Sequence, residues 1–393
     1  MYRIFCVVLL SVQLATLALL TSVPANSEMI QLLWKKDRRS DSDLFRFGSV
    51  SQRRGFINST GEVVLRHQKG TPTIKGDFFE GMAKAWDTWF GYIDTRGNWI
   101  IPPKFMAATD FSSGLAAVRV GELWGYVDRQ GELAIKPQFD GARDFHDDRA
   151  AVRKGDRYGY IDRSGNLVVP FRYSVAHNFS HKRAWVVREP GPCWVTAPMA
   201  DQASTRRGIG PLRFLHEIPN CRYELIDQAG TAIGDRLFDD VHDFSEGRAA
   251  VAFYNPFGAT WGYIDDASNF VLPPEFGNAK SFSGGLAAVR PHRGDVRKGW
   301  GYINLEGNFV IEPSFVEASG FSDGLAAVAT LDVERRAFDR FFIDRSGRQA
   351  FPSTFFVHSD FVHGLAVVLT SDGEPPLYID TSGNVVFANS NDR

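Results

Sequence analysis

The sequence lacks the features that would indicate catalysis, metal binding or nucleic-acid binding. Lys and Arg number 44 against 46 Asp and Glu, so a formal charge of −2 gives no basic excess to match nucleic-acid phosphates. No nucleophile, base and orienting residue are recognisable in the sequence as a catalytic triad, and no Asp-x-Asp-x-Asp-Gly loop marks a calcium site. We therefore expect no enzyme, no cofactor and no metal site in this chain.

Long hydrophobic runs are absent except at the very start. Arg3 precedes an apolar run from Ile4 to Leu20, and small residues follow at Val23 to Ala25, which is the pattern of a secretory signal peptide over residues 1–25. An uncleaved anchor helix is the alternative, although 17 residues are short for a membrane span. We expect a secreted or periplasmic protein with no membrane span after signal cleavage.

One short motif is written repeatedly along the rest of the chain. Its fullest form is Trp124-Gly125-Tyr126-Val127-Asp128, with Gly131 three residues after the aspartate. Close copies begin at Phe90, Tyr158, Trp261 and Trp300, and weaker copies begin at Gly55, Glu224, Phe342 and Tyr378. Nine recurrences of one unit indicate a repeat architecture in which neighbours complete each other's core.

The motif predicts a β-hairpin. Trp124, Tyr126 and Asp128 alternate with smaller residues, and aromatic and β-branched residues favour a strand. Asp128 and Gly131 have the spacing of a turn whose aspartate binds its own backbone. A second apolar strand follows, and we expect a proline such as Pro137 to end it.

A second motif lies upstream of the hairpin. Phe111-Ser112-Ser113-Gly114-Leu115-Ala116-Ala117-Val118 recurs from Phe282 and from Phe321. Both faces of its Leu-Ala-Ala-Val portion are apolar, which predicts a strand covered on both sides. The alanine pair predicts close spacing between stacked sheets.

Together these motifs resemble the bacterial WG-repeat (KWG) family over nearly all of residues 45–387. Glu224 and Phe342 depart from the expected glycine, and Asn58 and Asn304 from the expected aspartate. The resemblance implies a β-repeat protein of largely unassigned function and supplies no catalytic residue.

We therefore predict an all-β chain of tandem four-stranded units. Residues 26–43 form a charged linker, 44–387 the repeat array and 388–393 a tail. About four strands in ~40 residues is the size of a propeller blade, which favours a propeller-like ring. Nine units exceed the usual ~4–8 blades, so an open β-solenoid is the alternative.

An insertion at residues 189–222 interrupts the repeat. It contains Cys193 and Cys221, which we expect to form a disulfide in an oxidising compartment. Long irregular loops are often functional, so the candidate partner loop is this insertion. Its candidate contact residues are Trp194, Arg206, Arg207 and His216. The alternative is a decorated connection without a ligand.

The histidine pairs and the repeated aspartates could be interpreted as metal ligands, but their positions do not favour this. His177 with His181, and His358 with His363, are close in sequence but lie in predicted β structure, where they share no helix face for a metal. Turn capping explains the repeated aspartates better than calcium binding does.

The repeated tryptophans leave two interpretations. They could form platforms for sugar rings if they are exposed, or they could fill the space between sheets. The residues concerned are Trp86, Trp89, Trp99, Trp124, Trp261 and Trp300.

Three functions follow from these patterns. The first is a non-catalytic scaffold that binds a protein partner. The alternative is a binder of carbohydrate or cell-envelope polymer through exposed aromatics. The third is an enzyme with its site at the ring axis, but no convergent polar residues are recognisable in the sequence.

Overall fold

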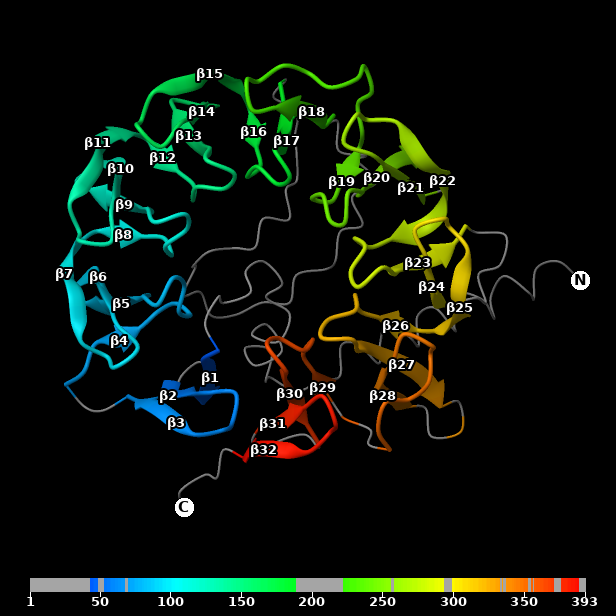
Figure 1. Cartoon of the computed structure of the whole chain (residues 1–393). Helices are drawn as coiled ribbons and strands as arrows, with labels where there is room; N and C mark the ends of the chain where they lie inside the picture. The colour runs from blue at the N-terminus through cyan, green and yellow to red at the C-terminus, as the bar shows by residue number, and fades with distance from the viewer. Residues whose placement is uncertain are drawn as a thin grey trace, which may run out of the picture.

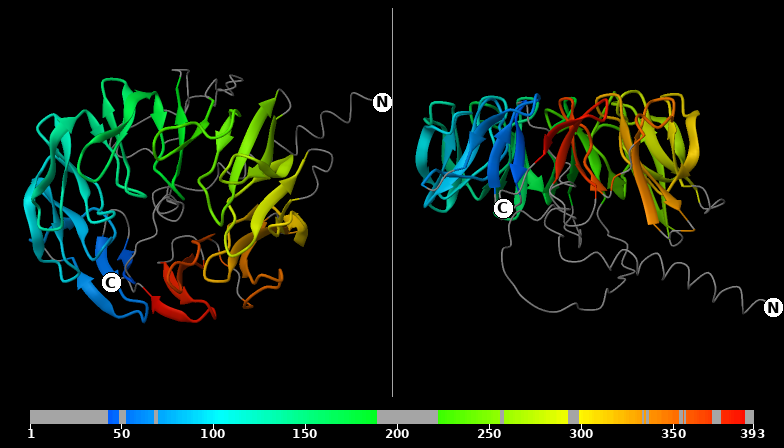
Figure 2. Two further views of the ribbon diagram at one scale, coloured as in Figure 1. Left: turned by 45° about the horizontal axis from the view of Figure 1, so that its top comes forward. Right: turned by 90° about the horizontal axis from the view of Figure 1, so that it is seen from below.

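The computed structural model describes residues 43–48, 53–67, 70–188, 222–255, 258–292, 299–332, 334, 337–352, 355, 357–370 and 376–388. Every regular element in these ranges is a β-strand, which confirms the all-β prediction. Small antiparallel sheets follow one another around a ring (Figure 1), which is shallow when seen from its side (Figure 2). Within the described ranges, no helix is long and apolar enough to cross a membrane.

Nine units make up the ring, each built from consecutive strands. Unit 1 has β1 (Phe45–Gly48), β2 (Arg53–Ile57) and β3 (Val63–Arg66). Unit 2 has β4 (Thr73–Ile74), β5 (Ala83–Asp87), β6 (Trp89–Ile93) and β7 (Trp99–Phe105). Unit 3 has β8 (Ala107–Ala108), β9 (Ala116–Val120), β10 (Leu123–Val127) and β11 (Leu133–Phe139). Unit 4 has β12 (Gly141–Ala142), β13 (Ala150–Lys154), β14 (Arg157–Ile161) and β15 (Leu167–Tyr173). Unit 5 has β16 (Val175–Ala176), β17 (Arg183–Val187) and β18 (Glu224–Asp227).

The second half repeats this plan. Unit 6 has β19 (Asp240–Val241), β20 (Ala249–Asn255), β21 (Gly258–Ile264) and β22 (Phe270–Ala279). Unit 7 has β23 (Ala287–Pro291), β24 (Trp300–Ile303) and β25 (Phe309–Phe315), and it shares one seven-stranded sheet with unit 6 because β22 also pairs with β23. Unit 8 has β26 (Glu317–Ala318), β27 (Ala326–Asp332) and β28 (Ala337–Ile343). Unit 9 has β29 (Val357–His358), β30 (Leu365–Leu369), β31 (Leu377–Asp380) and β32 (Val385–Ala388).

The motif tyrosine, where a unit has one, joins that unit to the next. Tyr126 lies opposite Ala117, is fully buried, and donates its hydroxyl to the Arg143 carbonyl of unit 4 at 2.7 Å. The small alanine leaves room for the ring, which packs edge-on against Phe145 at 4.9 Å. The same hydroxyl bond recurs from Tyr92 to Thr109, Tyr160 to His177, Tyr263 to Lys280 and Tyr302 to Ser319. The core therefore lies between units, as the alanine pairs predicted.

The motif glycine faces a bulge in the outer strand. Trp124 pairs with Phe139 but Tyr126 pairs with Ile135, so the outer strand carries extra residues opposite Gly125. A Cβ on Gly125 would lie 2.4 Å from the Ile135 carbonyl oxygen, which only glycine avoids. Pro137 lies inside this bulge, and β11 continues past it. The prediction that proline ends the strand was wrong, because a bulge needs no donor there.

The strand registers of units 5 and 8 account for the two residues that depart from the motif glycine. Glu224 takes the glycine position of unit 5, and β18 is flanked outside only by isolated bridges rather than by a bulged strand. In unit 8 the register places Phe342 opposite Ala327, which is the tyrosine position, so Phe341 replaces the glycine. The assignment of Phe342 to the glycine position was therefore wrong by one residue.

The first and last units close the ring. Tyr378 of unit 9 donates its hydroxyl to the Arg46 carbonyl of unit 1, and the Phe47 and Phe387 rings lie 5.0 Å apart. A Cβ on Gly61 would lie 2.9 Å from Cγ1 of Val386. The closed ring confirms the propeller-like prediction over the open solenoid. Side-chain packing makes this closure, since the described strands of units 1 and 9 belong to separate sheets.

Candidate functional site

The ring has two edges, and different strand connections lie at each of them. Antiparallel strands place the β8–β9 and β10–β11 turns at one edge, here called the turn edge, and the β9–β10 connection at the other, here called the tip edge. Equivalent connections in the other units follow the same rule. Residues 189–221 join β17 to β18, so the insertion leaves the ring from the tip edge.

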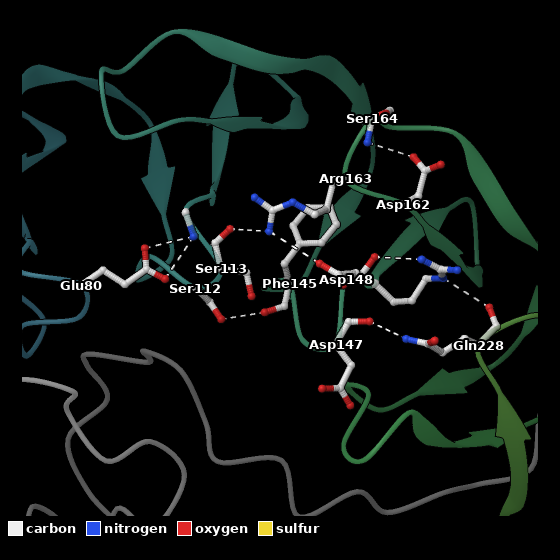
Figure 3. A network of polar contacts seen from close by, with 12 residues as sticks. Glu80, Ser112, Ser113, Phe145, Asp147, Asp148, Asp162, Arg163, Ser164 and Gln228 are labelled. Carbon is white, nitrogen blue, oxygen red and sulfur yellow. Dashed lines mark hydrogen bonds and ion pairs between the residues drawn. The ribbon is translucent and has the colours of Figure 1, made fainter.

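Polar groups of the turn edge are used to link the units (Figure 3). The Glu80 carboxylate accepts the Gly114 amide of the next unit at 3.0 Å, and Ser112 donates its hydroxyl to the Phe145 carbonyl at 2.6 Å. Arg163 donates to the Ser113 carbonyl of the preceding unit at 2.5 Å. Serine and carboxylate links of the same kind recur at Ser180, Ser245, Ser322, Asp147, Glu246 and Asp323. This edge holds the ring together.

The repeated aspartates cap turns, as predicted. Oδ1 of Asp128 accepts the backbone amides of Gln130 and Glu132 at 3.0 and 2.9 Å. Carboxylate oxygens make the equivalent bonds at Asp94, Asp162, Asp227, Asp265, Asp344 and Asp380. The hydrogen bond from the Ser346 hydroxyl lowers the pKa of Asp344. No group of three or more His, Cys, Asp or Glu side chains gathers as a metal site among the described residues.

The histidines of interest have structural contacts. His177 packs edge-on against Tyr223 at 5.5 Å, and its carbonyl receives the Tyr160 hydroxyl. His181 and His363 lie in the tight turns at φ values of 54° and 48°. The His358 side chain lies outside the described residues.

Charged residues hold the base of the insertion. Arg188, the last described residue before it, binds both carboxylate oxygens of Glu224 at 2.6 and 3.0 Å. This hydrogen bonding raises the pKa of Arg188. Arg157 of unit 4 donates to the Arg188 carbonyl at 2.7 Å, and Arg222 pairs with Asp239 of unit 6 at 3.1 Å. Both ends of the insertion are thereby fixed to the ring.

The insertion itself lies outside the described residues. This applies to the expected Cys193–Cys221 disulfide and to Trp194, Arg206, Arg207 and His216. The expected signal peptide at residues 1–25 lies outside them as well.

The six tryptophans divide into two groups. Trp261 is buried, and Trp99, Trp124 and Trp300 are partly buried and pack against the cores between units. Trp86 and Trp89 are each 43% exposed at the tip of the β5–β6 hairpin. Trp86 lies opposite Phe90, so the alternation of the strand places Trp89 on the other face of the sheet. These two rings do not form one common platform.

Trp185 was missed by the sequence reasoning. Unit 5 has Leu225 at the tyrosine position, and Trp185 stands opposite it where other units have alanine. The large and small residues have exchanged places. The indole Nε1 donates to the His242 carbonyl at 3.0 Å, which replaces the missing tyrosine bond. The signal in the sequence is that Leu225 replaces the motif tyrosine, so another residue of unit 5 has to supply the missing hydrogen bond.

The geometry defines a class: a ring of tandem antiparallel β units joined through aromatic cores. The profile of the family described as "WG containing repeat" matches residues 90–124, 124–158, 158–189, 225–255, 261–290 and 300–330. The chain belongs to the WG-repeat family.

Comparison with curated proteins finds no match. Among solved structures, one from a study of two prolyl endopeptidases is 13% identical, with a TM-score of 0.39 over 71% of this chain and 48% of that one. The β-propeller domain of the Trilobed protease from Pyrococcus furiosus is 10% identical, with a TM-score of 0.32 over 68% of this chain and 90% of that domain. Oligopeptidase B from Trypanosoma brucei is 9% identical, with a TM-score of 0.39 over 73% of this chain and 49% of the other. The chain spans about half the length of the two peptidase matches, and such low scores carry no argument about function.

Proposed function

We propose that the protein is a secreted or periplasmic, non-catalytic scaffold that binds a protein partner at its tip edge. The observation that carries this proposal is the fixed base of the insertion, where Arg188 and Glu224 join the two ends of a long connection. A rigid base lowers the ordering cost of a binding loop. Many polar groups of the turn edge are already used to link the units.

The test is affinity capture from envelope extract with the mature chain and a version lacking residues 189–221. We expect the deletion to abolish recovery of the partner while the melting temperature of the ring stays within a few degrees. The matched control is Asp156→Ala, a substitution at the β13–β14 tip on the same edge, where the side chain is 89% exposed. Equal recovery by the full and deleted chains would contradict the role of the insertion.

Binding of an envelope polymer is the second candidate, favoured by the exposure of Trp86 and Trp89. It predicts that sacculi sediment the wild-type protein but not the Trp86→Ala/Trp89→Ala variant. Cell fractionation with an epitope-tagged full-length chain tests the secreted or periplasmic location, which depends on residues 1–25 acting as a signal peptide.

A further inference from the structure

Four large apolar side chains are exposed where units 2 and 3 meet at the tip edge. They are Trp86 at 43%, Met106 at 41%, Val120 at 43% and Leu123 at 37% exposure, here called the seam patch. Isolated apolar residues are ordinary on a protein surface, but a group at one seam marks an interaction site.

Strand register places all four at the same seam. Trp86 shares a sheet face with Tyr92, which packs against unit 3, and it lies at the tip end of that face. Val120 and Leu123 pair with each other on the face of unit 3 that carries Val118 and packs against unit 2. Met106 lies in the link between the units, with its amide bonded to the Arg119 carbonyl beside Val120.

The next seam shows that the fold does not need apolar residues there. By register, the positions of Trp86, Met106, Val120 and Leu123 are filled between units 3 and 4 by Arg119, Asp140, Lys154 and Arg157. Asp140 has a local task in that seam, because its carboxylate accepts the Gly155 amide of the tip at 2.7 Å. Met106, at the equivalent position, has no carboxylate to make this capping bond. Because the same four positions are charged at one seam and apolar at the next, the fold does not require apolar residues there, and binding is a better explanation for them.

The chemistry of the seam patch favours a peptide segment over a sugar. Val120, Leu123 and Met106 offer no strong hydrogen-bonding groups, and sugar hydroxyls buried against them would lose their water partners without replacement, which is unfavourable. Trp and Met are enriched in the cores of protein interfaces, where Trp often dominates the affinity.

A lysine lies beside the patch. The Lys75 amine lies 5.7 Å from the centre of the Trp86 ring. Among the described residues it has no carboxylate partner within ion-pair distance. A carboxylate next to an apolar anchor on the partner would match this arrangement.

We propose that the seam patch binds a protein segment that presents an aromatic or aliphatic anchor next to an acidic residue. This inference rests on the proposed scaffold function and adds a second contact surface on the same edge as the insertion. Trp86 and Leu123 hold the anchor, and Lys75 pairs with the acid.

A peptide-display selection on the mature protein tests the inference. The comparison variant carries Trp86→Arg, Met106→Asp, Val120→Lys and Leu123→Arg, which copies residues that the 3–4 seam already accommodates. We expect selected peptides to contain an apolar residue beside Asp or Glu, and their affinity to fall at least about tenfold in this variant. Lys75→Ala should weaken binding less, and Lys154→Ala at the 3–4 seam should leave it unchanged.

Several outcomes would overturn the inference. These are peptides that bind the variant as well as the wild type, sacculi retained only by the wild type, or a wild-type dimer in sedimentation that the variant lacks. If envelope capture fails for the insertion deletion but persists in the seam variant, the scaffold function stands and the seam patch is rejected. If the wild type captures nothing from the envelope but binds the peptides through the patch, the seam patch stands and the proposed role of the insertion falls.

Discussion

At the residue scale, one hydroxyl does much to fix how each unit sits on the next. Tyr92, Tyr126, Tyr160, Tyr263 and Tyr302 each bond a carbonyl 17 residues further along the chain. The ring of each tyrosine fills the core between units while its hydroxyl satisfies a carbonyl that would otherwise be buried without a partner.

We expect Tyr126→Phe to lower the free energy of unfolding by about 1–2 kcal/mol, because the Arg143 carbonyl loses its buried partner. Urea unfolding at neutral pH measures this change. The matched control is Tyr158→Phe, since Tyr158 is only partly buried and its hydroxyl has no hydrogen bond to the other described residues in the structure. Equal losses in both variants would contradict the role given to the hydroxyl.

Alkaline pH should destabilise the ring through the same residues. Burial raises the pKa of Tyr126, Tyr160 and Tyr263 well above that of an unfolded tyrosine near ~10. The folded state therefore keeps its protons while the unfolded state releases them, so the stability is full below pH ~10 and declines as the pH rises beyond it. Urea midpoints between pH 8 and 11 measure this decline, and Tyr126→Phe/Tyr263→Phe should show a shallower one. An unchanged slope in that variant would contradict the assignment.

At the scale of the element, the bulge in the outer strand determines which residue the neighbouring strand tolerates at the glycine position. Gly91, Gly125, Gly159, Gly262 and Gly301 all face a carbonyl of the bulged outer strand within 2.8 Å of a built Cβ. Where glycine is absent, at Glu224 and Phe341, the described outer segment is held by only two isolated bridges in each unit instead of a continuous strand. The side chain and the neighbouring strand therefore change together.

Gly125→Ala should destabilise the protein by roughly 1–3 kcal/mol, because the methyl group forces the bulge to shift. Chemical denaturation gives the value. Gly121→Ala is the matched control, since its Cβ meets nothing within 4 Å and only its positive φ of 61° is strained. A smaller loss at Gly125 than at Gly121 would contradict the close-contact account.

The exchange in unit 5 predicts coupling between two residues. Trp185→Ala should leave a cavity and Leu225→Tyr should collide with Trp185, while the double variant restores the alanine–tyrosine pair of the other units. The double variant should be more stable than the sum of the single changes predicts, by roughly 1–3 kcal/mol. A double-mutant cycle in urea measures this coupling, and additivity would show that the two positions are independent.

The sequence was sufficient for the strands, the turns and the covered alanines because each follows from a local pattern. Asp128 with Gly131 predicts its turn wherever the motif occurs, and the aromatic alternation predicts the strand. The passage of β11 through Pro137 was not predictable in this way, because the bulge depends on the register of a neighbouring strand. Trp185 was missed for the same reason, since its partner Leu225 lies beyond the insertion.

The candidate site was less accessible from sequence than the fold. Exposure of Trp86 and burial of Trp261 cannot be predicted from the motifs, because Trp86 lies outside the motif, four residues before Phe90, while Trp261 holds the motif position itself. The seam patch joins residues of two units, and it becomes visible only when register assigns each side chain to a face.

At the scale of the whole molecule, nine similar units form a ring that is closed at the seam between units 9 and 1. Arg46 connects three units there. Its carbonyl accepts the Tyr378 hydroxyl of unit 9, while its guanidinium pairs with Asp77 of unit 2 at 2.9 Å and lies over Phe56 of its own unit. Closure thus relies on the side chains of a few residues rather than on a strand shared between the ends.

The most direct test of this closure is the distance between spin labels at the exposed positions Val64 in unit 1 and Val385 in unit 9, in a background with the native cysteines replaced by serine. The closed ring predicts one short distance, below about 30 Å, since the two units pack directly against each other. Sheets stacked in an open row are ~10 Å apart, so eight steps would separate the labels by roughly 80 Å. A distance distribution centred at the longer value would contradict the ring.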